Sequence, residues 1–253
     1  MKRSVNSLIG YTIGALDGEI GKVKEFYFDD VTWTIRYLIV ETGSWLSGRK
    51  VLIATEALLK PEWDVSIFPI NLTKEQIENS PDIDTEKTVS RQQEIKLYEY
   101  YPWTSYWGKG LWTGDLGTTG MVMPLQEPLD LAVKKEISDT TIRETKVDSN
   151  LRSTNDVKGY SIHALDGEIG DVSDFIFDDS IWKINFLVVD TGNWFPGKKV
   201  LLSPNLIKEI KWITSSVIVD TTVNSIKNSP EYDQDKPLNE LYESDLSNYY
   251  KRT

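Results

Sequence analysis

The sequence predicts a mainly β protein made of two tandem small β-barrel modules, each followed by a short helical tail. Three observations predict this architecture. A long segment recurs later in the chain, apolar and polar residues alternate within it, and Gly-containing turns interrupt it at short intervals. The 253 residues suffice for two ordinary domains, and each module is large enough to bury a modest core of its own.

The repeat has an offset of 149 residues. Gly10 to Gly21 recurs as Gly159 to Gly170, and the match continues through Phe-x-Phe-Asp-Asp-x-x-Trp, which ends at Trp33 and at Trp182. Such extended self-similarity indicates a duplication.

The repeat also divides the chain. We expect a first module with its tail at 1–101, a Gly- and aromatic-rich and then polar linker at 102–156, and a second module with its tail at 157–253.

Residue patterns within the first copy predict its elements, and the second copy should follow them. Four segments have the β-branched and aromatic composition and period of strands: 19–29, 36–41, 49–53 and 65–70. Asp17-Gly18 and Asp166-Gly167 predict type I′ hairpin turns, because Asp-Gly tolerates the positive φ angles of that turn. Thr73 is expected to open a short helix, and Ser90-x-x-Gln93 is a capping box for a tail helix at 92–101.

The composition excludes several classes of chemistry. The chain has no cysteine, which removes disulfides, thiol nucleophiles and zinc–thiolate sites and fits a cytoplasmic location. No run of about 18 apolar residues exists, so we expect no membrane span. The net charge of −11 opposes binding to nucleic acid, whose phosphates attract Lys and Arg.

Candidate catalytic groups each have a simpler structural explanation. The single histidine, His163, is replaced by Gly14 in the first copy, which favours a surface role. Gly192 to Lys198 has P-loop spacing, but Lys199 follows where Ser or Thr is required and a strand is expected next. The pairs Asp29-Asp30 and Asp178-Asp179 are best explained as turn formers. We therefore predict no enzyme activity, no catalytic, metal or cofactor-binding residue, and no cofactor.

Aromatic residues are the stronger candidates for function. Trp33 and Trp182 are expected to fill the core. Trp45 and Trp194 lie in Gly-bounded loops, where they could clamp a tail, pack the two barrels together or meet a partner. The tails are also aromatic, and we expect them to pack on a barrel of their own or of the other copy. The candidate interaction surface is Trp45, Trp194, Tyr100, Tyr101, Trp103, Trp107, Tyr249 and Tyr250.

These motifs resemble the PRC-barrel family. The resemblance rests on both Gly-Tyr-x-Ile-x-Ala-x-Asp-Gly-Glu-Ile-Gly segments, on Phe-x-Phe-Asp-Asp-x-x-Trp, and on Val-(Glu/Asp)-Thr-Gly-x-Trp at Val40 to Trp45 and Val189 to Trp194. The family takes its name from the cytoplasmic domain of the photosynthetic reaction centre H subunit, so the resemblance implies a barrel similar to that domain. The family also includes a domain of a ribosome maturation factor. The H subunit's membrane helix and the ribosome factor's other domain are not found here.

The sequence thus favours a protein-interaction or assembly function for two pseudo-symmetric barrels, acting through aromatic loops and tails. The sequence does not distinguish self-association from binding to a separate protein partner. The alternative is a small ligand or cofactor bound in a cleft between the barrels, which converging polar groups would indicate. A role tied to photosynthetic electron transport or ribosome maturation is a third, weaker hypothesis.

Overall fold

The computed structural model describes residues 1–83, 89–101, 103–106, 150–192 and 198–252, and for Arg252 the backbone alone. The chain forms two compact units. The larger unit contains Met1–Glu78 and Asn150–Thr253, and therefore both copies of the repeat, whereas Asn79–Ser149 forms the smaller one. The tail helix of the first copy, α2 (Arg91–Tyr100), lies in the smaller unit and has the predicted Ser90–Gln93 capping box.

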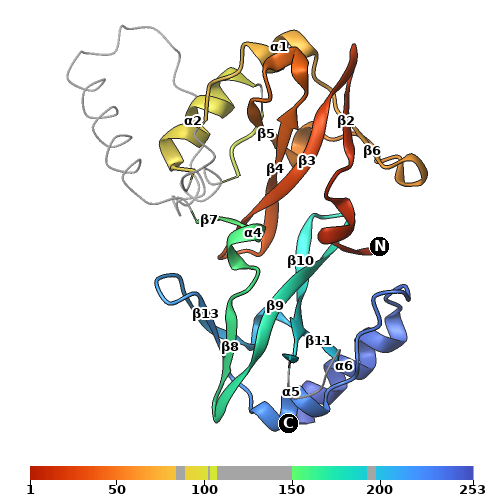
Figure 1. Cartoon of the computed structure of the whole chain (residues 1–253), viewed down its shortest axis with the longest axis vertical. Helices are drawn as coiled ribbons and strands as arrows, with labels where there is room; N and C mark the ends of the chain where they lie inside the picture. The colour runs from red at the N-terminus through yellow and green to blue at the C-terminus, as the bar shows by residue number, and fades with distance from the viewer. Residues whose placement is uncertain (84–88, 102, 107–149, 193–197, 253) are drawn as a thin grey trace, which may run out of the picture. The chain divides into compact units, whose positions relative to one another are not determined.

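The mainly β fold is confirmed, and most strands of one copy have an equivalent in the other (Figure 1). The first copy has β1 (Lys2–Ser4), β2 (Thr12–Ala15), β3 (Gly18–Asp29), β4 (Thr34–Thr42), β5 (Lys50–Ala54), β6 (Ile67–Pro69) and α1 (Lys74–Glu78). The second has β7 (Leu151–Ser153), α4 (Thr154–Val157), β8 (Ser161–Ala164), β9 (Gly167–Asp178), β10 (Lys183–Asp190), β11 (Lys199–Leu202), β12 (Ile207–Lys211), β13 (Ser216–Val219), α5 (Val223–Asn228) and α6 (Glu240–Arg252).

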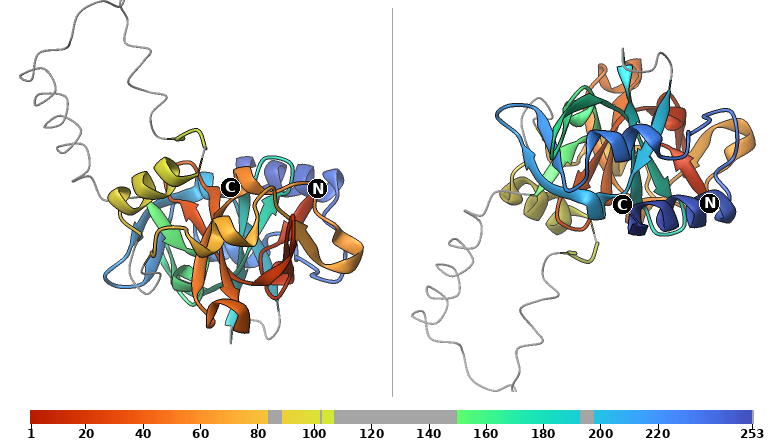
Figure 2. Two further views of the ribbon diagram at one scale, coloured as in Figure 1. Left: turned by 90° about the horizontal axis from the view of Figure 1, so that it is seen from above. Right: turned by 90° about the horizontal axis from the view of Figure 1, so that it is seen from below.

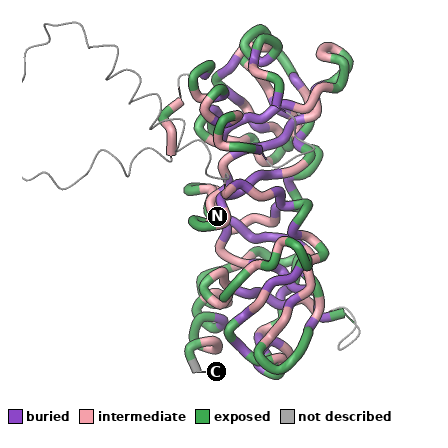
Figure 3. Tube along the Cα trace, turned by 90° about the vertical axis from the view of Figure 1, so that its left-hand side faces the viewer, coloured by how far each residue is buried: buried purple, intermediate pink, exposed green. Residues whose placement is uncertain are grey.

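The strands of each copy follow the alternating sequence pattern. Long antiparallel pairs, β3 with β4 and β9 with β10, form the centre of each barrel, and their inward residues are fully buried. The predicted strand at 65–70 is shorter than expected, because Trp63–Val65 forms a 3-10 turn before β6. Figure 3 shows that buried positions follow the strands through the region where the copies meet, whereas the turns are exposed.

The first strand of each copy pairs with the other copy. β1 lies antiparallel to β9, with Arg3 opposite Phe177, and β7 lies antiparallel to β3, with Arg152 opposite Phe28. The two pairings are equivalent under the 149-residue offset, so the exchange is reciprocal. A further bridge joins β4 to β10, and the thirteen strands of the described residues thereby form one sheet.

This exchange changes one predicted boundary. Residues 150–156 were expected to belong to the linker, but they form β7 and most of α4. A three-residue strand is too short to show an alternating pattern, and its partner strand is in the other copy.

We call the contact region of the two copies the junction. It is formed by β1 on β9, by β7 on β3, and by the turns after β3 and β9.

The tail of the second copy packs on its own barrel. Helix α6 lies outside the strands of that copy (Figure 2), where Leu246 joins a cluster with Ile176, Val188, Leu201 and Tyr232. Tyr249 Oη also donates a hydrogen bond of 2.8 Å to the carbonyl of Ser225. One of the two alternatives for the tails is therefore observed here, namely docking on the same copy.

We expect Leu246→Ala to lower the free energy of unfolding by about 2–4 kcal/mol, because it leaves a cavity under α6. Leu246 is 2% exposed, whereas Leu241 on the same helix is 76% exposed. The matched variant Leu241→Ala should therefore change stability by less than about 0.5 kcal/mol. Urea unfolding of both variants checks this, and equal effects would show that α6 does not contribute through its buried face.

Candidate interaction surface

The second acid of each Asp-Asp pair joins the two copies. Arg3 Nε lies 2.7 Å from Asp179 Oδ2, and Arg152 Nε lies 3.0 Å from Asp30 Oδ2. Each arginine comes from an exchanged strand and each aspartate from the other copy. The prediction that these acids only form turns is wrong for Asp30 and Asp179, since their partners lie more than 100 residues away in the sequence.

The first acid of each pair forms the turn, as predicted. Asp29 Oδ1 accepts hydrogen bonds from the backbone N–H of Val31 at 3.1 Å and of Thr32 at 2.7 Å. Asp178 Oδ1 accepts one from the N–H of Ser180 at 2.9 Å. The two carboxylates of a pair therefore serve different partners and do not converge on a common ligand.

The same arginines stack on tryptophans. Arg3 Cζ lies 3.5 Å from the centroid of the Trp63 ring, and Arg152 Cζ lies 4.5 Å from that of Trp212. Each guanidinium is thus held between an aromatic face and a carboxylate, which fixes its orientation. These tryptophans recur in the repeat, and the arginines explain why the module places them there.

A buried acid holds the exchanged strand at its other end. Ser4 Oγ donates to Asp174 Oδ2, and the N–H of Asn6 donates to Asp174 Oδ1 at 3.0 Å. The equivalent pair joins Ser153 to Glu25. Burial raises the pKa of Asp174, and its hydrogen bonds partly oppose that shift. Because Asp174 is 1% exposed, removal of Ser4 would leave a buried carboxylate with one partner fewer.

Trp33 and Trp182 also belong to the junction. Both were predicted to fill the core, but both are only half-buried. They stack on Phe28 and Phe177 at centroid distances of 5.4 and 5.2 Å. Both have left-handed backbones, with φ of 57° and 55°. This conformation directs each carbonyl to the other copy, where Ile184 N–H and Ile35 N–H donate to them at 2.7 Å.

We expect acid to weaken the junction. The hydrogen bond from Ser180, together with Lys2, lowers the pKa of Asp178, and the pKa of Asp179 is also lowered because hydrogen bonds from Arg3 and the N-terminal amine outweigh burial. A lowered pKa contributes stability above the unfolded value of about 3.9, and this stability is lost as the pH falls through the folded value. Asp30 acts in the opposite direction, because burial outweighs Arg152 and raises its pKa.

The variant Asp178→Asn should therefore show a smaller loss of stability between about pH 4 and pH 2 than the unmodified chain. Asp245→Asn, at an exposed site on α6, is the matched control for the removal of one carboxylate. The free energy of unfolding measured by urea titration at each pH checks this. Identical slopes for the three proteins would contradict it.

Each copy presents an exposed turn at its far end from the junction. The β2–β3 turn and the β8–β9 turn point to opposite ends of the larger unit (Figure 1). Leu16 and Leu165 occupy the same position in these turns and are 66% and 62% exposed. We call these turns, with the helix start that each one caps, the end surfaces.

The Asp of each end surface caps a helix. Asp17 Oδ1 accepts from the N–H of Lys74 at 2.9 Å, and Asp166 Oδ1 accepts from the N–H of Val223 at 2.6 Å. The predicted structural role of both Asp-Gly turns is observed, but type I′ is wrong. Ala15 pairs with Gly18, which leaves Leu16 and Asp17 at the centre of the turn, and neither of them has a positive φ.

Trp45 lies beside the first end surface and is half-buried. Its Nε1 donates to the carbonyl of Ile20 at 2.7 Å, and Lys74 Nζ lies 5.6 Å from its ring centroid. The indole is thus fixed on its own copy with part of its ring exposed. Trp194, its counterpart, lies outside the described residues.

The aromatic residues of the first tail contact one another within the smaller unit. Tyr101 stacks on Trp103 at 4.2 Å and meets Tyr100 edge-on at 4.8 Å. Trp107 lies outside the described residues. In the second tail, Tyr250 packs against the cluster under α6, where burial raises its pKa to about 12. Tyr249 and Tyr250 therefore contribute to docking of α6.

The remaining chemical candidates have structural roles. Lys198 Nζ donates to the carbonyls of Lys227 and Ser229 at 2.6 and 3.1 Å, at the end of α5, and β11 follows as a strand. Its counterpart Arg49 donates in the same way to Glu78 at the end of α1. His163 lies in β8, is partly exposed, and is 3.1 Å from Ser161 Oγ through Nε2.

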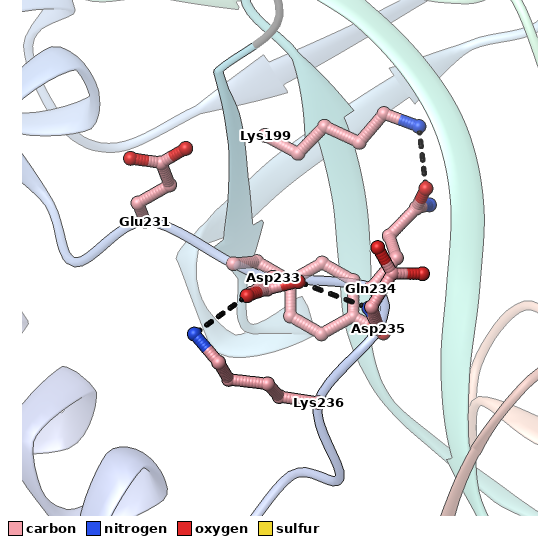
Figure 4. Close-up of a pocket in the computed structure, with 7 residues that line it drawn as sticks. Lys199, Glu231, Asp233, Gln234, Asp235 and Lys236 are labelled. Atoms are coloured by element: carbon pink, nitrogen blue, oxygen red, sulfur yellow. Dashed lines mark hydrogen bonds and ion pairs between the residues drawn. The ribbon is translucent and has the colours of Figure 1, made fainter.

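Hollows on the larger unit are lined by polar side chains in some places and by apolar side chains in others. The one in Figure 4, of about 580 Å³, is lined by the loop before α6, where Lys236 pairs with Asp233 at 2.8 Å and Lys199 donates to Gln234 at 3.0 Å. These charged groups pair with each other along the loop and do not converge on an empty centre. Within the ranges that the structure describes, no three His, Cys, Asp or Glu side chains form a metal-binding group.

The alternative hypothesis requires a cleft between the barrels, and a groove lies at the junction. It has a volume of about 240 Å³ and is lined by Asp30, Trp33, Trp212 and β12. Typical small-molecule pockets enclose about 300–1,000 Å³, so this groove is small for a cofactor. Asp30 is also committed to Arg152 there.

These features define a class: a duplicated β-barrel protein whose copies are joined by exchanged strands. The PRC-barrel domain model matches residues 2–70 and 150–224, more than half of the chain, and the chain belongs to the PRC-barrel family. The second match begins at residue 150, one residue before β7 begins to pair with the first copy. No curated protein matches the chain. In the described part of the chain, no helix is both long and apolar enough to cross a bilayer.

Proposed function

We propose that this chain is a non-enzymatic interaction or assembly protein that binds a protein partner at its two end surfaces. One observation carries the proposal: the same apolar side chain, Leu16 or Leu165, is largely exposed at the same turn of both copies. Exposed apolar residues are common singly, but repetition at equivalent turns of one body favours a shared role.

The geometry of the first end surface supports a partner contact. The turn is held rigidly, because Asp17 caps α1 and the N–H of Leu16 donates to the carbonyl of Leu72 at 2.9 Å. Trp45 adds a fixed, partly exposed indole beside it. A turn that is already fixed loses little conformational entropy on binding, and tryptophan is among the residues enriched at interface hot spots.

The aromatic tails take a smaller part in this proposal than the sequence suggested. Tyr249 and Tyr250 contact their own copy, and Tyr101 and Trp103 contact each other. The partner surface is therefore centred on the turns and on the Trp45 loop. The lack of cysteine supports a cytoplasmic location for this function.

Affinity capture from the native host tests the proposal. The double variant Leu16→Glu/Leu165→Glu should lose a captured protein at least about tenfold, because it places charge on both anchors. Leu241→Glu, at a 76% exposed leucine of α6, is the matched control and should retain the protein. Equal capture by both variants would contradict a role of the end surfaces.

The alternative function is binding of a small ligand in the junction groove, which Trp33 and Trp212 line. Native mass spectrometry of the purified chain distinguishes the two. A bound mass that persists in Leu16→Glu/Leu165→Glu and is lost in Trp212→Ala would favour the ligand. A chain without bound mass whose partner depends on Leu16 and Leu165 would favour the interaction protein.

A further inference from the structure

We propose that the junction is also a self-recognition surface between chains, at which the module of a second copy of this chain can take the place of the module from the same chain. The inference goes beyond the proposed function, because it concerns a different surface and names its partner. Four sets of contacts carry it.

The first set is the strand register. Lys2, Arg3 and Ser4 lie opposite Asp178, Phe177 and Ile176, and the equivalent residues of the second copy lie opposite the equivalent residues of the first. Each copy therefore donates one strand and accepts one. Donor and acceptor sites on the same module are the requirement for a self-complementary, two-fold interface.

The second set is the pairing of charges. Arg3 meets Asp179 and Arg152 meets Asp30, and each arginine is stacked on a tryptophan of the module that donates it. If two first copies paired, Arg3 would face Asp30, which is again an Arg–Asp pair. The charges therefore favour pairing of modules without restricting it to one first and one second copy.

The third set is the serine–acid contact inside the junction. Ser4 binds Asp174 and Ser153 binds Glu25, and either acid would accept from either serine.

The fourth set is the shared apolar core, in which Phe28 lies 5.8 Å from Phe175 and Phe68 lies 5.9 Å from Trp182. Each of these ring pairs joins the two copies, so neither copy buries its aromatic residues alone.

The connection between the copies decides which pairing forms. Residues 79–149 join α1 to β7 in the same chain, so pairing within the chain is intramolecular and has an effective concentration of up to about 1 mM. At micromolar chain concentration the internal pair should therefore dominate. A tether too short to join the two sites would exclude the internal pair and leave only pairing between chains.

The two attachment points are far apart. The carbonyl of Glu78 accepts from Arg49, next to the end of β3 that contains Gly21, whereas the carbonyl of Asn150 accepts from Asp30 at the other end of β3. The nine residue-to-residue steps from Gly21 to Asp30 span roughly 30 Å in an extended strand. Two glycines reach only roughly 10 Å, whereas a Gly/Ser segment of about 40 residues has a root-mean-square length of roughly 35 Å.

Two replacements of residues 79–149 test the inference. With about 40 Gly/Ser residues we expect a monomer, and with two glycines a closed dimer of twice the mass by light scattering, both with the same far-UV spectrum. Both variants lack the smaller unit, so the comparison isolates tether length. A folded monomer with two glycines, or loss of folding in that variant alone, would overturn the inference.

If both replacements fail to fold, the full-length chain provides the test. The chain has no cysteine, so Lys2→Cys and Asp178→Cys can be placed on separate, co-expressed chains. These residues are opposite each other in β1 and β9, and such pairs have Cα distances suited to a disulfide. We expect a disulfide between chains whose yield rises with concentration. Its absence, while the double variant closes within one chain, would overturn the inference.

These experiments separate this inference from the proposed function. A tether-dependent dimer without any partner captured through Leu16 and Leu165 would uphold self-recognition and reject the end surfaces. A captured partner without exchange between chains would do the reverse.

Discussion

Gly170→Ala should destabilise the protein by at least about 3 kcal/mol more than Gly159→Ala. A Cβ at Gly170 would lie 1.9 Å from the carbonyl oxygen of Asp190, a backbone atom of the adjacent strand that cannot rotate away. Gly159 has a similar positive φ, 83° against 65°, but a Cβ at this position would meet no atom within 4 Å. Its substitution should cost only the left-handed strain of about 1–2 kcal/mol.

This difference explains the last residue of the Asp-Gly-Glu-Ile-Gly motif. Gly21, its counterpart in the first copy, would bring a Cβ to 2.1 Å from the carbonyl oxygen of Glu41. The glycine therefore allows β3 to approach β4 closely, and β9 to approach β10. This close approach, more than the freedom of glycine to adopt a positive φ, explains why the motif ends in glycine. Thermal and urea unfolding of the two alanine variants measure the difference, and equal losses of stability would contradict the proposed contact.

Phe28→Ala should destabilise both copies together, by about 3–5 kcal/mol. Phe28 is fully buried, stacks on Trp33 and lies 5.8 Å from Phe175 of the other copy. Because the ring belongs to a core shared by both copies, its loss should shift one cooperative transition of the larger unit. Two separate transitions, of which only one moves, would show that the copies unfold independently.

A double-mutant cycle measures the contact itself. The double variant Phe28→Ala/Phe175→Ala should lose less stability than the sum of the single variants, by about 0.5–1.5 kcal/mol, because the two rings share one contact. Tryptophan fluorescence and far-UV circular dichroism should report the same midpoint. Strict additivity would mean that the two rings contribute separately.

The sequence predicted the parts of the fold that depend on local pattern. The long strands, the Asp29 and Asp178 turns and the Ser90 capping box follow from residues close to one another in the chain, and the repeat follows from comparing the chain with itself. The PRC-barrel resemblance rested on the same motifs and is confirmed. These features are determined by periodicity, turn chemistry and helix capping, which a single sequence displays directly.

The junction could not be predicted in this way. Its strands contain three residues each, and their partners lie about 125 to 175 residues away, so neither length nor spacing indicates the pairing. One signal was present: Arg3-Ser4 recurs as Arg152-Ser153 at the 149-residue offset, ahead of each module. Trp63 and Trp212 recur at the same offset, but their role as ring faces for these arginines required the structure.

The candidate surface was predicted only in part. Trp45 lies in the predicted Gly-bounded loop, next to an exposed turn, but the leucines of that turn were not singled out. An apolar residue at the centre of a hairpin turn is unusual, since polar residues and glycine favour turns, and its repetition at Leu16 and Leu165 was visible in the sequence.

Cleavage of the connection between the copies tests the central claim most directly. A protease site inserted within residues 107–149 of the full-length chain would separate it into two fragments after folding. If the exchanged strands hold the copies together, the fragments should co-elute as one species of unchanged mass at micromolar concentration, and Arg3→Glu should weaken that association. Two fragments that elute separately, each with its own folded spectrum, would contradict the claim.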